Sequence, residues 1–311
     1  MAVAPTQISV QSSTRKPLRR DESAARRLLR RPMAWCGIAI IALLIGVALF
    51  APQISKIDPT QIFPNGVNAL GEPHAPGAEF KLGADTLGRD VWTRVLYGAR
   101  VSLEVGFFAM LSSVVIGTII GLVSGYFGGW IDGALMRFTD VIISLPTVLL
   151  VIAFVAVLPV EPIQIFGREF DRNVFNMLLA IGLVTWTRVA RTVRGEVLSL
   201  KRREFIEAAH ATGCSSGRII FRHLLPNVLP TIIVLATLNT ANNILLEAGL
   251  SYLGLGVEAK TPSWGGMISE GQPFLLSAPW IALAPGIAIV LAVAGFNFVG
   301  QALQETLEPR A

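Results

Sequence analysis

Three polar side chains recur every four residues inside an otherwise apolar run, TIIVLATLNTANNILLEAGL. They are Asn239, Asn243 and Glu247, and side chains four residues apart share one face of a helix. Two amides and a carboxylate can make several hydrogen bonds, and leaving them unpaired in hydrocarbon is costly. The stripe must therefore face protein or water. Two interpretations carry equal weight: the wall of a hydrated pathway, and hydrogen bonds that join neighbouring helices.

Side chains that could carry catalysis are few. The three histidines, His74, His210 and His223, all lie outside the apolar runs, and the chain has no H-E-x-x-H motif. A phosphate-binding loop needs Gly-Lys-Ser/Thr, and no lysine in the chain follows a glycine. The sequence therefore disfavours an enzyme embedded in the membrane. It also indicates that any ATP that drives the protein is bound by another chain.

The composition of the 311-residue chain indicates an integral membrane protein. Hydrophobic residues make up 52% of the chain and charged residues 15%, and the formal net charge is +5 with a pI of about 9.6. Sparse charge gathered into a few places is typical of helices in lipid. We therefore interpret the basic balance as a topology signal rather than a nucleic-acid surface, and we expect no nucleic-acid partner. The two cysteines, Cys36 and Cys214, are expected to be separate thiols.

Six apolar runs approach or exceed the ~20 residues that a helix needs to cross a bilayer. Because backbone groups in lipid must satisfy their own hydrogen bonds, we expect these runs to be helices and the fold to be all-α. Gly117, Gly121 and Gly125 place small residues on one face of the second run, which allows close helix packing. The predicted spans are 33–51, 101–126, 135–158, 174–192, 228–248 and 279–300.

The placement of lysine and arginine predicts the orientation. With residue 1 in the cytoplasm, 18 of the 26 Lys and Arg residues fall on the inner side and eight on the outer side, which follows the positive-inside rule. Both termini are then cytoplasmic, and residues 1–31 form a disordered basic leader before a membrane domain at 32–311. A cleaved signal peptide is the competing interpretation, but the first run is long for one and no A-x-A-like site follows it. The predicted outer loops are 52–100, 159–173 and 249–278.

Two parts of the outer side carry local signals. Asp85 is predicted to cap an amphipathic helix, with Leu87, Val91 and Val95 on one face, that leads into the second span. Trp264 lies among several glycines and a proline, and an exposed tryptophan there would form a contact surface for a partner protein. A loop that packs on its own bundle is an equal alternative for Trp264.

Between the fourth and fifth spans, residues 193–227 form a charged stretch on the predicted inner side. Residues 204–211 are good helix formers, and Gly213 is expected to turn the chain with a positive φ. A following serine can cap a second short helix, which Pro226 is expected to end. Two short helices at an angle can dock on a protein or lie on lipid, and residue physics alone favours neither.

This charged stretch resembles the EAA loop of ABC importer permeases. The motif is matched in composition, in spacing and in its position between two late spans. His223, followed by Leu-Leu-Pro-Asn, is similar to the dipeptide/oligopeptide branch, and so are segments 82–103, 193–213 and 250–268. The resemblance covers roughly residues 33–310, and the chain looks like the second of the two permease subunits of such a transporter. The ATPase-coupling residues that the resemblance implies are Glu207, Ala208, Ala209, Gly213, His223, Leu225 and Pro226.

The same resemblance implies a type I ABC importer permease fold, with about six transmembrane helices, in the bacterial plasma (inner) membrane. The implied partners are a second homologous permease subunit, two ATPase subunits that hold ATP and Mg²⁺, an extracytoplasmic substrate-binding protein and membrane lipid. No cofactor is expected in this chain. The implied solute is a dipeptide or oligopeptide, and the alternative is nickel, glutathione or another small solute. A secondary transporter or an intramembrane enzyme is a weaker alternative.

Overall fold

The computed structural model describes Leu28 and residues 30–159, 163–165, 168–170, 172–256 and 261–307, so most of the predicted leader lies outside the described residues. Within that range, five helical segments are long and apolar enough to cross a membrane, and one bent helix pair can form a sixth span. The prediction of about six membrane helices is therefore confirmed. The five segments are α2 (Pro32–Ile54), α3 (Val91–Phe127), α6 (Arg172–Leu200), the continuous segment Ser216–Tyr252, and α11 (Trp280–Leu307).

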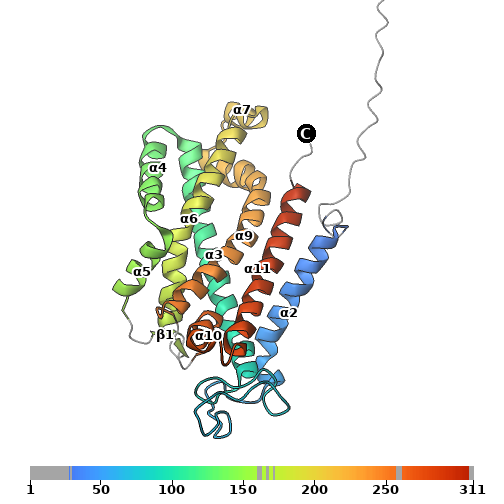
Figure 1. Cartoon of the computed structure of the whole chain (residues 1–311). Coiled ribbons are helices and arrows are strands. Elements are labelled where there is room, and N and C mark those ends of the chain that lie inside the picture. Colours follow the sequence, from blue (N-terminus) through green and yellow to red (C-terminus); the bar gives the residue numbers. More distant parts are fainter. Residues whose placement is uncertain are drawn as a thin grey trace, which may run out of the picture.

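The helices form one bundle with two different ends (Figure 1). Helix α7 (Glu204–Ala211) lies at one end, the same end as the start of α2 and the end of α11. The irregular loop that precedes α3 lies at the opposite end, near α10 (Trp264–Gly271), which η2 (Gln272–Phe274) extends by one 3₁₀ turn. The described part also contains a short hairpin of β1 (Ile163–Ile165) and β2 (Arg168–Phe170), in which Ile163 pairs with Phe170.

The third predicted span, 135–158, is two helices rather than one. Helices α4 (Gly129–Ser144) and α5 (Thr147–Val157) meet at an angle of 94°. Leu145, at the break, has the extended conformation (φ −91°, ψ 140°) that a residue before proline prefers, and Pro146 lacks the N–H that would continue the helix. The expectation of an uninterrupted span is therefore wrong at this point.

The second short helix predicted after Gly213 is the start of a long one. α8 (Ser216–Arg218) continues through a π-helical turn, η1 (Ile219–Leu224), into α9 (Leu225–Tyr252). A proline ring normally clashes with the carbonyl four residues earlier, and the wider π turn immediately before Pro226 gives that ring more room. The prediction that Pro226 ends the helix is therefore wrong, and the charged stretch is built directly onto the fifth span.

Helix α3 begins later than predicted, at Val91, because Asp90 and not Asp85 caps it. The Asp90 carboxylate accepts a hydrogen bond from the backbone N–H of Thr93 at 2.9 Å, which satisfies one of the free N–H groups of the first turn. Asp85 instead begins a tight turn that contains Gly88 at a positive φ of 80°. The helix then runs without interruption through the predicted second span, so the separate interfacial helix is a wrong prediction.

A buried ionic cluster holds this end of α3 against α10. Asp85 is fully buried and pairs with two arginines, and both of these arginines also bind Glu270 of α10. One of these contacts, from the Arg89 side chain to Glu270, is 2.8 Å long. Because each arginine meets two carboxylates, the cluster ties the start of α3 and the turn before it to α10. Its members are Asp85, Arg89, Arg94 and Glu270.

Close packing of α3 on α6 organises the centre of the bundle. A Cβ atom placed on Gly117, Gly121 or Gly125 would lie 2.6, 2.7 or 2.8 Å from the Cβ atom of a valine on α6. Real side chains do not approach so closely, so only glycine allows this contact between the two helices. The predicted small-residue face is confirmed as a helix-packing seam. The facing residues on α6 are, in order, Val189, Val193 and Val197.

Candidate coupling surface and pathway pocket

Helix α7 stands at one end of the bundle and is held there by two apolar side chains. Ile206 is fully buried and Ala209 is nearly so, and both belong to one hydrophobic cluster. Their partners come from four other elements, so α7 is packed on the bundle and not tethered loosely to it. Among the partners are Tyr126 of α3, Val197 of α6, Leu224 of η1 and Val228 of α9.

Gly213 ends α7 in a left-handed turn. Its φ is 74°, which is the positive value expected from the sequence. The N–H of Gly213 donates to the carbonyl of His210 at 3.0 Å, and the N–H of Cys214 donates to the carbonyl of Ala209 at 3.1 Å. This pair of bonds is the Schellman motif, which satisfies carbonyls at a helix C-terminus. A Cβ atom on Gly213 would meet nothing within 4 Å, so backbone conformation alone requires the glycine.

An aromatic contact joins α7 to the end of α3, and a lysine joins the end of α6 to the same place. The rings of His210 and Tyr126 stack with 6.1 Å between their centroids and 10° between their planes. Lys201, just after α6, donates from Nζ to the carbonyl oxygen of Tyr126 at 2.6 Å. A lysine at the last carbonyls of a helix complements the negative end of its dipole. Tyr126 is therefore the residue of α3 that contacts both α7 and the end of α6.

The outward face of α7 is free for a partner. Glu207 and Ala208 are exposed, and Phe205 nearby exposes 42% of its surface. Phe221, on the adjoining π turn, exposes 70%. Exposed aromatic residues beside a small residue and a carboxylate suit close protein contact. Of the other predicted coupling residues, Ala209 faces the core of this chain, His223 and Leu225 are half-buried, and Gly213 and Pro226 are exposed.

The turn after α7 also contains the spacing Gly-x-Ser-x-Gly at residues 213–217, a feature that the sequence analysis missed. In hydrolases this motif places a serine nucleophile on a strand-to-helix turn. Here the motif follows helix α7, and Ser215 is exposed. The local structure therefore lacks the context of a nucleophile elbow.

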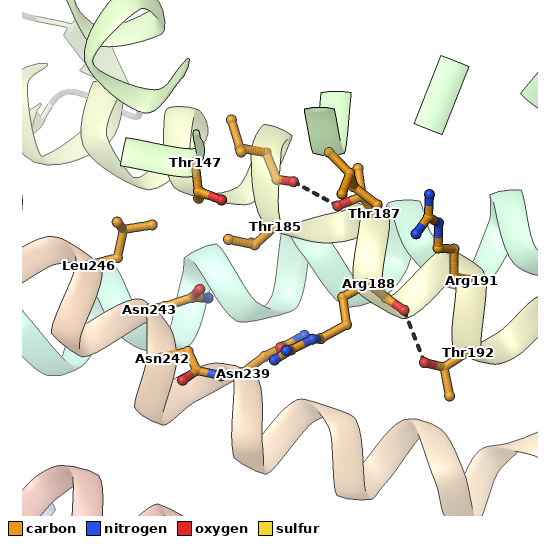
Figure 2. Close-up of a pocket in the computed structure, with 12 residues that line it drawn as sticks. Thr147, Thr185, Thr187, Arg188, Arg191, Thr192, Asn239, Asn242, Asn243 and Leu246 are labelled. Carbon is orange, nitrogen blue, oxygen red and sulfur yellow. Dashed lines mark hydrogen bonds between the residues drawn. The ribbon is translucent and has the colours of Figure 1, made fainter. Parts of the chain in front are cut away.

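A pocket of about 640 Å³ lies between α6 and α9 and is bordered by the bend between α4 and α5 (Figure 2). Asn239 and Asn243 of the predicted polar stripe line it from α9, together with Asn242. Arg188 and Arg191 line it from α6, and Figure 2 shows the Arg188 side chain directed toward the α9 wall. Threonines from α5 and α6 complete the polar lining; they are Thr147, Thr185, Thr187 and Thr192.

Several polar atoms of this wall lack a partner within the protein. Asn243 is fully buried, yet neither its amide nitrogen nor its amide oxygen makes a hydrogen bond with the described residues. The amide nitrogen of Asn239 is in the same state. An unsatisfied buried polar group costs about 1–3 kcal/mol. These unpaired amide atoms therefore form no hydrogen bond to a neighbouring helix. Water or a solute in the pocket can supply their hydrogen-bond partners.

Glu247 differs from the other two residues of the stripe. It is fully buried, it does not line the pocket, and Ser251 donates to its Oε1 at 2.8 Å. Its other carboxylate oxygen, Oε2, has no hydrogen-bond partner among the described residues. Glu247 therefore lies outside the pocket, and its described hydrogen bond stays within α9.

Trp264 is buried rather than exposed, so the expected contact surface for a partner is wrong. Only 1% of its surface is accessible, and its Nε1 donates to the carbonyl oxygen of Val95 at 3.0 Å. The ring packs directly beside Gly98 of α3 and joins a cluster that includes Ile244 of α9. The alternative from the sequence, a loop packed on its own bundle, is the arrangement found.

Trp264→Ala is accordingly expected to destabilise the protein. Deleting a buried aromatic ring from a packed site typically costs about 3–5 kcal/mol, and this one also removes a hydrogen bond. We expect a clearly lower midpoint in thermal unfolding of the detergent-purified protein. Leu70→Ala is a matched control, because Leu70 is 84% exposed in the loop that precedes α3 and should leave the midpoint unchanged. An unchanged midpoint for Trp264→Ala would show that the ring is not a core residue.

The fold and the two sites together define a class of protein. An apolar helical bundle with a polar pocket, and with a packed short helix at one end, fits a membrane transport subunit. Residues 117–311 match the family described as binding-protein-dependent transport system inner membrane component, and residues 22–75 match the N-terminal transmembrane domain of oligopeptide transport permease C. The chain belongs to the first of these families, whose fold is that of type I ABC importer permeases. The second match starts at residue 22, inside the basic segment that we expected to lie outside the resemblance.

Relatives of known role extend over nearly the whole chain. The chain is 42% identical to the dipeptide transport system permease protein DppC of Alkalihalophilus pseudofirmus, over 92% of this chain and 89% of the relative. It is 36% identical to the oligopeptide transport system permease protein OppC of Bacillus subtilis, over 96% and 92%. It is 38% identical to the glutathione transport system permease protein GsiD of Escherichia coli, over 92% and 89%. This protein is therefore a permease component of a binding-protein-dependent ABC importer.

Proposed function

We propose that this chain imports short peptides as one of two permease subunits, and that α7 couples its movement to a separate ATPase. The observation that carries the coupling role is the rigid attachment of α7, whose inner face belongs to the same hydrophobic cluster as α3, α6 and α9. Force applied to the exposed face of α7 reaches the helices that line the pocket. The dipeptide and oligopeptide permeases among the relatives support the substrate class.

The proposed assembly follows from the family. It contains a second permease, two ATPase subunits that bind ATP and Mg²⁺, and a substrate-binding protein outside the membrane. The catalytic step belongs to the ATPase subunits, and this chain contributes no catalytic residue. Wide apolar faces on α2, α4 and α5 support a location among lipid and a partner permease, since large exposed apolar areas mark such contacts.

The proposed orientation places both termini and α7 in the cytoplasm of a bacterial cell. The bias of Lys and Arg toward this side supports it. It predicts that a cysteine at position 70, in the outer loop, reacts with a membrane-impermeant maleimide in intact cells, and that a cysteine at position 208 does not. The reverse labelling pattern would overturn the orientation.

Uptake by the reconstituted complex tests the function. Vesicles that contain both permeases and both ATPases should accumulate a labelled dipeptide when ATP is inside and loaded binding protein is outside. Omission of any component should stop accumulation, because no single chain holds both the pathway and the ATP site. Glutathione is the second candidate solute, and the related glutathione permeases favour it. Uptake of glutathione without uptake of dipeptides would move the assignment to that solute, and peptide uptake without the ATPases would overturn the proposed class of transporter.

A further inference from the structure

The pocket between α6 and α9 has the lining of a binding site for an anionic solute that contains amide groups. Its volume of about 640 Å³ is within the range of ~300–1,000 Å³ that is typical of small-ligand pockets. Its described lining includes two arginines and three asparagines, and no aspartate or glutamate. The walls therefore attract negative charge and offer both hydrogen-bond donors and acceptors.

Arg188 is the available cation of this lining. Arg191 is occupied, because its side chain pairs with Asp140 of α4. Arg188 is exposed and makes no ion pair with any described residue, and its side chain extends from α6 toward the wall that carries Asn239 (Figure 2). A guanidinium presents parallel N–H groups that match the two oxygens of a carboxylate.

The opposite wall, on α9, carries hydrogen-bond donors and an acceptor that can bind a peptide group. The amide of Asn243 has both a donor and an acceptor without a partner in the described structure, and Asn239 has a further donor. Both residues are at least nine-tenths buried and line the pocket. A peptide group likewise has one N–H donor and one C=O acceptor, so it can satisfy both free atoms of one asparagine side chain.

We propose that Arg188, Asn239 and Asn243 form a transit site that binds the C-terminal carboxylate of the moving peptide and the peptide group next to it. This proposal rests on the proposed function in peptide import and adds the residues that hold the solute inside the pathway. Arg188 binds the carboxylate, and the two asparagines bind the neighbouring backbone. The peptide binds this site only transiently during transport, so its affinity must be high enough for entry and low enough for release.

The discriminating experiment compares a dipeptide with its C-terminal amide in the reconstituted importer. Arg188→Gln should lower uptake of the free acid about tenfold or more, because a hydrogen-bonded charge partner is lost. It should change uptake of the amide less than about twofold, because the amide has no carboxylate for Arg188 to bind. Arg188→Lys should recover part of the free-acid uptake, since lysine keeps the charge without the planar fork.

Arg137→Gln is the matched control. Arg137 is an exposed arginine on α4 outside the pocket lining, so its loss removes the same charge from a neighbouring helix. Uptake of both peptide forms should match wild type in this variant. An equal loss of acid and amide uptake in Arg188→Gln would indicate a structural or lipid-headgroup role for Arg188 and would overturn the transit site. If the wild-type complex takes up no peptide at all, the proposed function fails instead.

Protection of a pocket cysteine tests the site even if the binding protein rejects the amide. With Cys36 and Cys214 replaced by serine, Asn242→Cys places a single thiol on the pocket wall. The free-acid dipeptide should slow maleimide labelling of this cysteine during turnover, and adding Arg188→Gln should abolish that protection. Protection that persists without Arg188, or no protection in the chain that retains it, would overturn the proposal.

Discussion

Glu207→Lys is expected to abolish attachment of the ATPase subunits while leaving the permease folded in the membrane. Glu207 is exposed on the outward face of α7, and its side chain makes no hydrogen bond or ion pair with the described residues, so its replacement removes no internal side-chain contact. Reversing a charge at a protein interface costs several kcal/mol. We therefore expect at least about a tenfold loss of ATPase co-purification and of peptide-stimulated ATP hydrolysis.

Gly213→Val tests the same surface by tilting α7 and not by changing its charge. A side chain at φ 74° costs roughly 1–2 kcal/mol, so the chain will relax away from the left-handed turn and reorient the helix. Gly217→Val is the matched control, because Gly217 is also exposed with nothing within 4 Å of an added Cβ, and its φ is not positive. ATP hydrolysis should lose its stimulation by peptide in Gly213→Val and should keep that stimulation in Gly217→Val.

The competing account of α7 is an amphipathic surface that lies on lipid. In that case Glu207→Lys would strengthen binding to anionic vesicles and would leave ATP hydrolysis coupled. Thermal unfolding of the isolated permease supplies the folding control, since neither account predicts a lower midpoint for Glu207→Lys. Wild-type ATPase attachment and wild-type stimulated hydrolysis in this variant would contradict docking at α7.

Gly121→Val is expected to disrupt the packing of α3 on α6 and to destabilise the protein strongly. An added Cβ would lie 2.7 Å from the carbonyl oxygen of Ala190 and 2.7 Å from the Cβ of Val193, and neither of these groups can swing aside. Overpacking of a tight core costs about 1–3 kcal/mol or more, and here the helices α3 and α6 must separate along the whole seam. We expect little folded protein after extraction in detergent.

Gly46→Val is the control for the glycine seam. Gly46 lies in the membrane helix α2, and an added Cβ there would meet nothing within 4 Å. This variant should be extracted in wild-type amount and should unfold at the wild-type temperature. Size-exclusion profiles of the two variants give the comparison. A monodisperse Gly121→Val protein with an unchanged unfolding midpoint would show that the packing of α3 on α6 does not depend on this glycine.

The sequence predicted the features that depend on composition and short spacing. Apolar length identified the membrane helices, and the four-residue repeat of Gly117, Gly121 and Gly125 identified a packing face before its partner helix was known. The positive φ of Gly213 was predictable for the same reason, since a helix that must end in a turn favours glycine. Each of these signals depends only on residues close together in the sequence. In each case the folded protein adopts the local conformation that those residues favour.

The predicted helix ends were wrong at two prolines, because one proline breaks its helix and the other lies within a continuous helix. Pro146 breaks the third span, whereas Pro226 and Pro230 lie inside a continuous helix. The difference depends on the turn before the proline: a π turn precedes Pro226, and an extended residue precedes Pro146. No pattern in a single sequence separates these two outcomes, because the π turn is stabilised by tertiary packing of Ile219 and Leu224.

The pathway residues were only partly predictable. The polar stripe marked Asn239 and Asn243, but it also included Glu247, which is buried outside the pocket and accepts a hydrogen bond from Ser251. Arg188 was counted only as a topology signal, although an arginine within a predicted span is itself a sign of function. Both interpretations of Trp264 stayed open, because composition does not reveal that Gly98 leaves space for its ring.

Cross-linking from α7 tests the central claim most directly. In the complete transporter, with Cys36 and Cys214 replaced by serine, a cysteine at position 208 should cross-link to an ATPase subunit through a short thiol-reactive linker. A cysteine at position 70, on the outer loop, should cross-link to neither ATPase. Efficient cross-linking from position 208 is the result that docking at α7 predicts. An intact complex that co-purifies with its ATPases but gives no such cross-link would contradict the account.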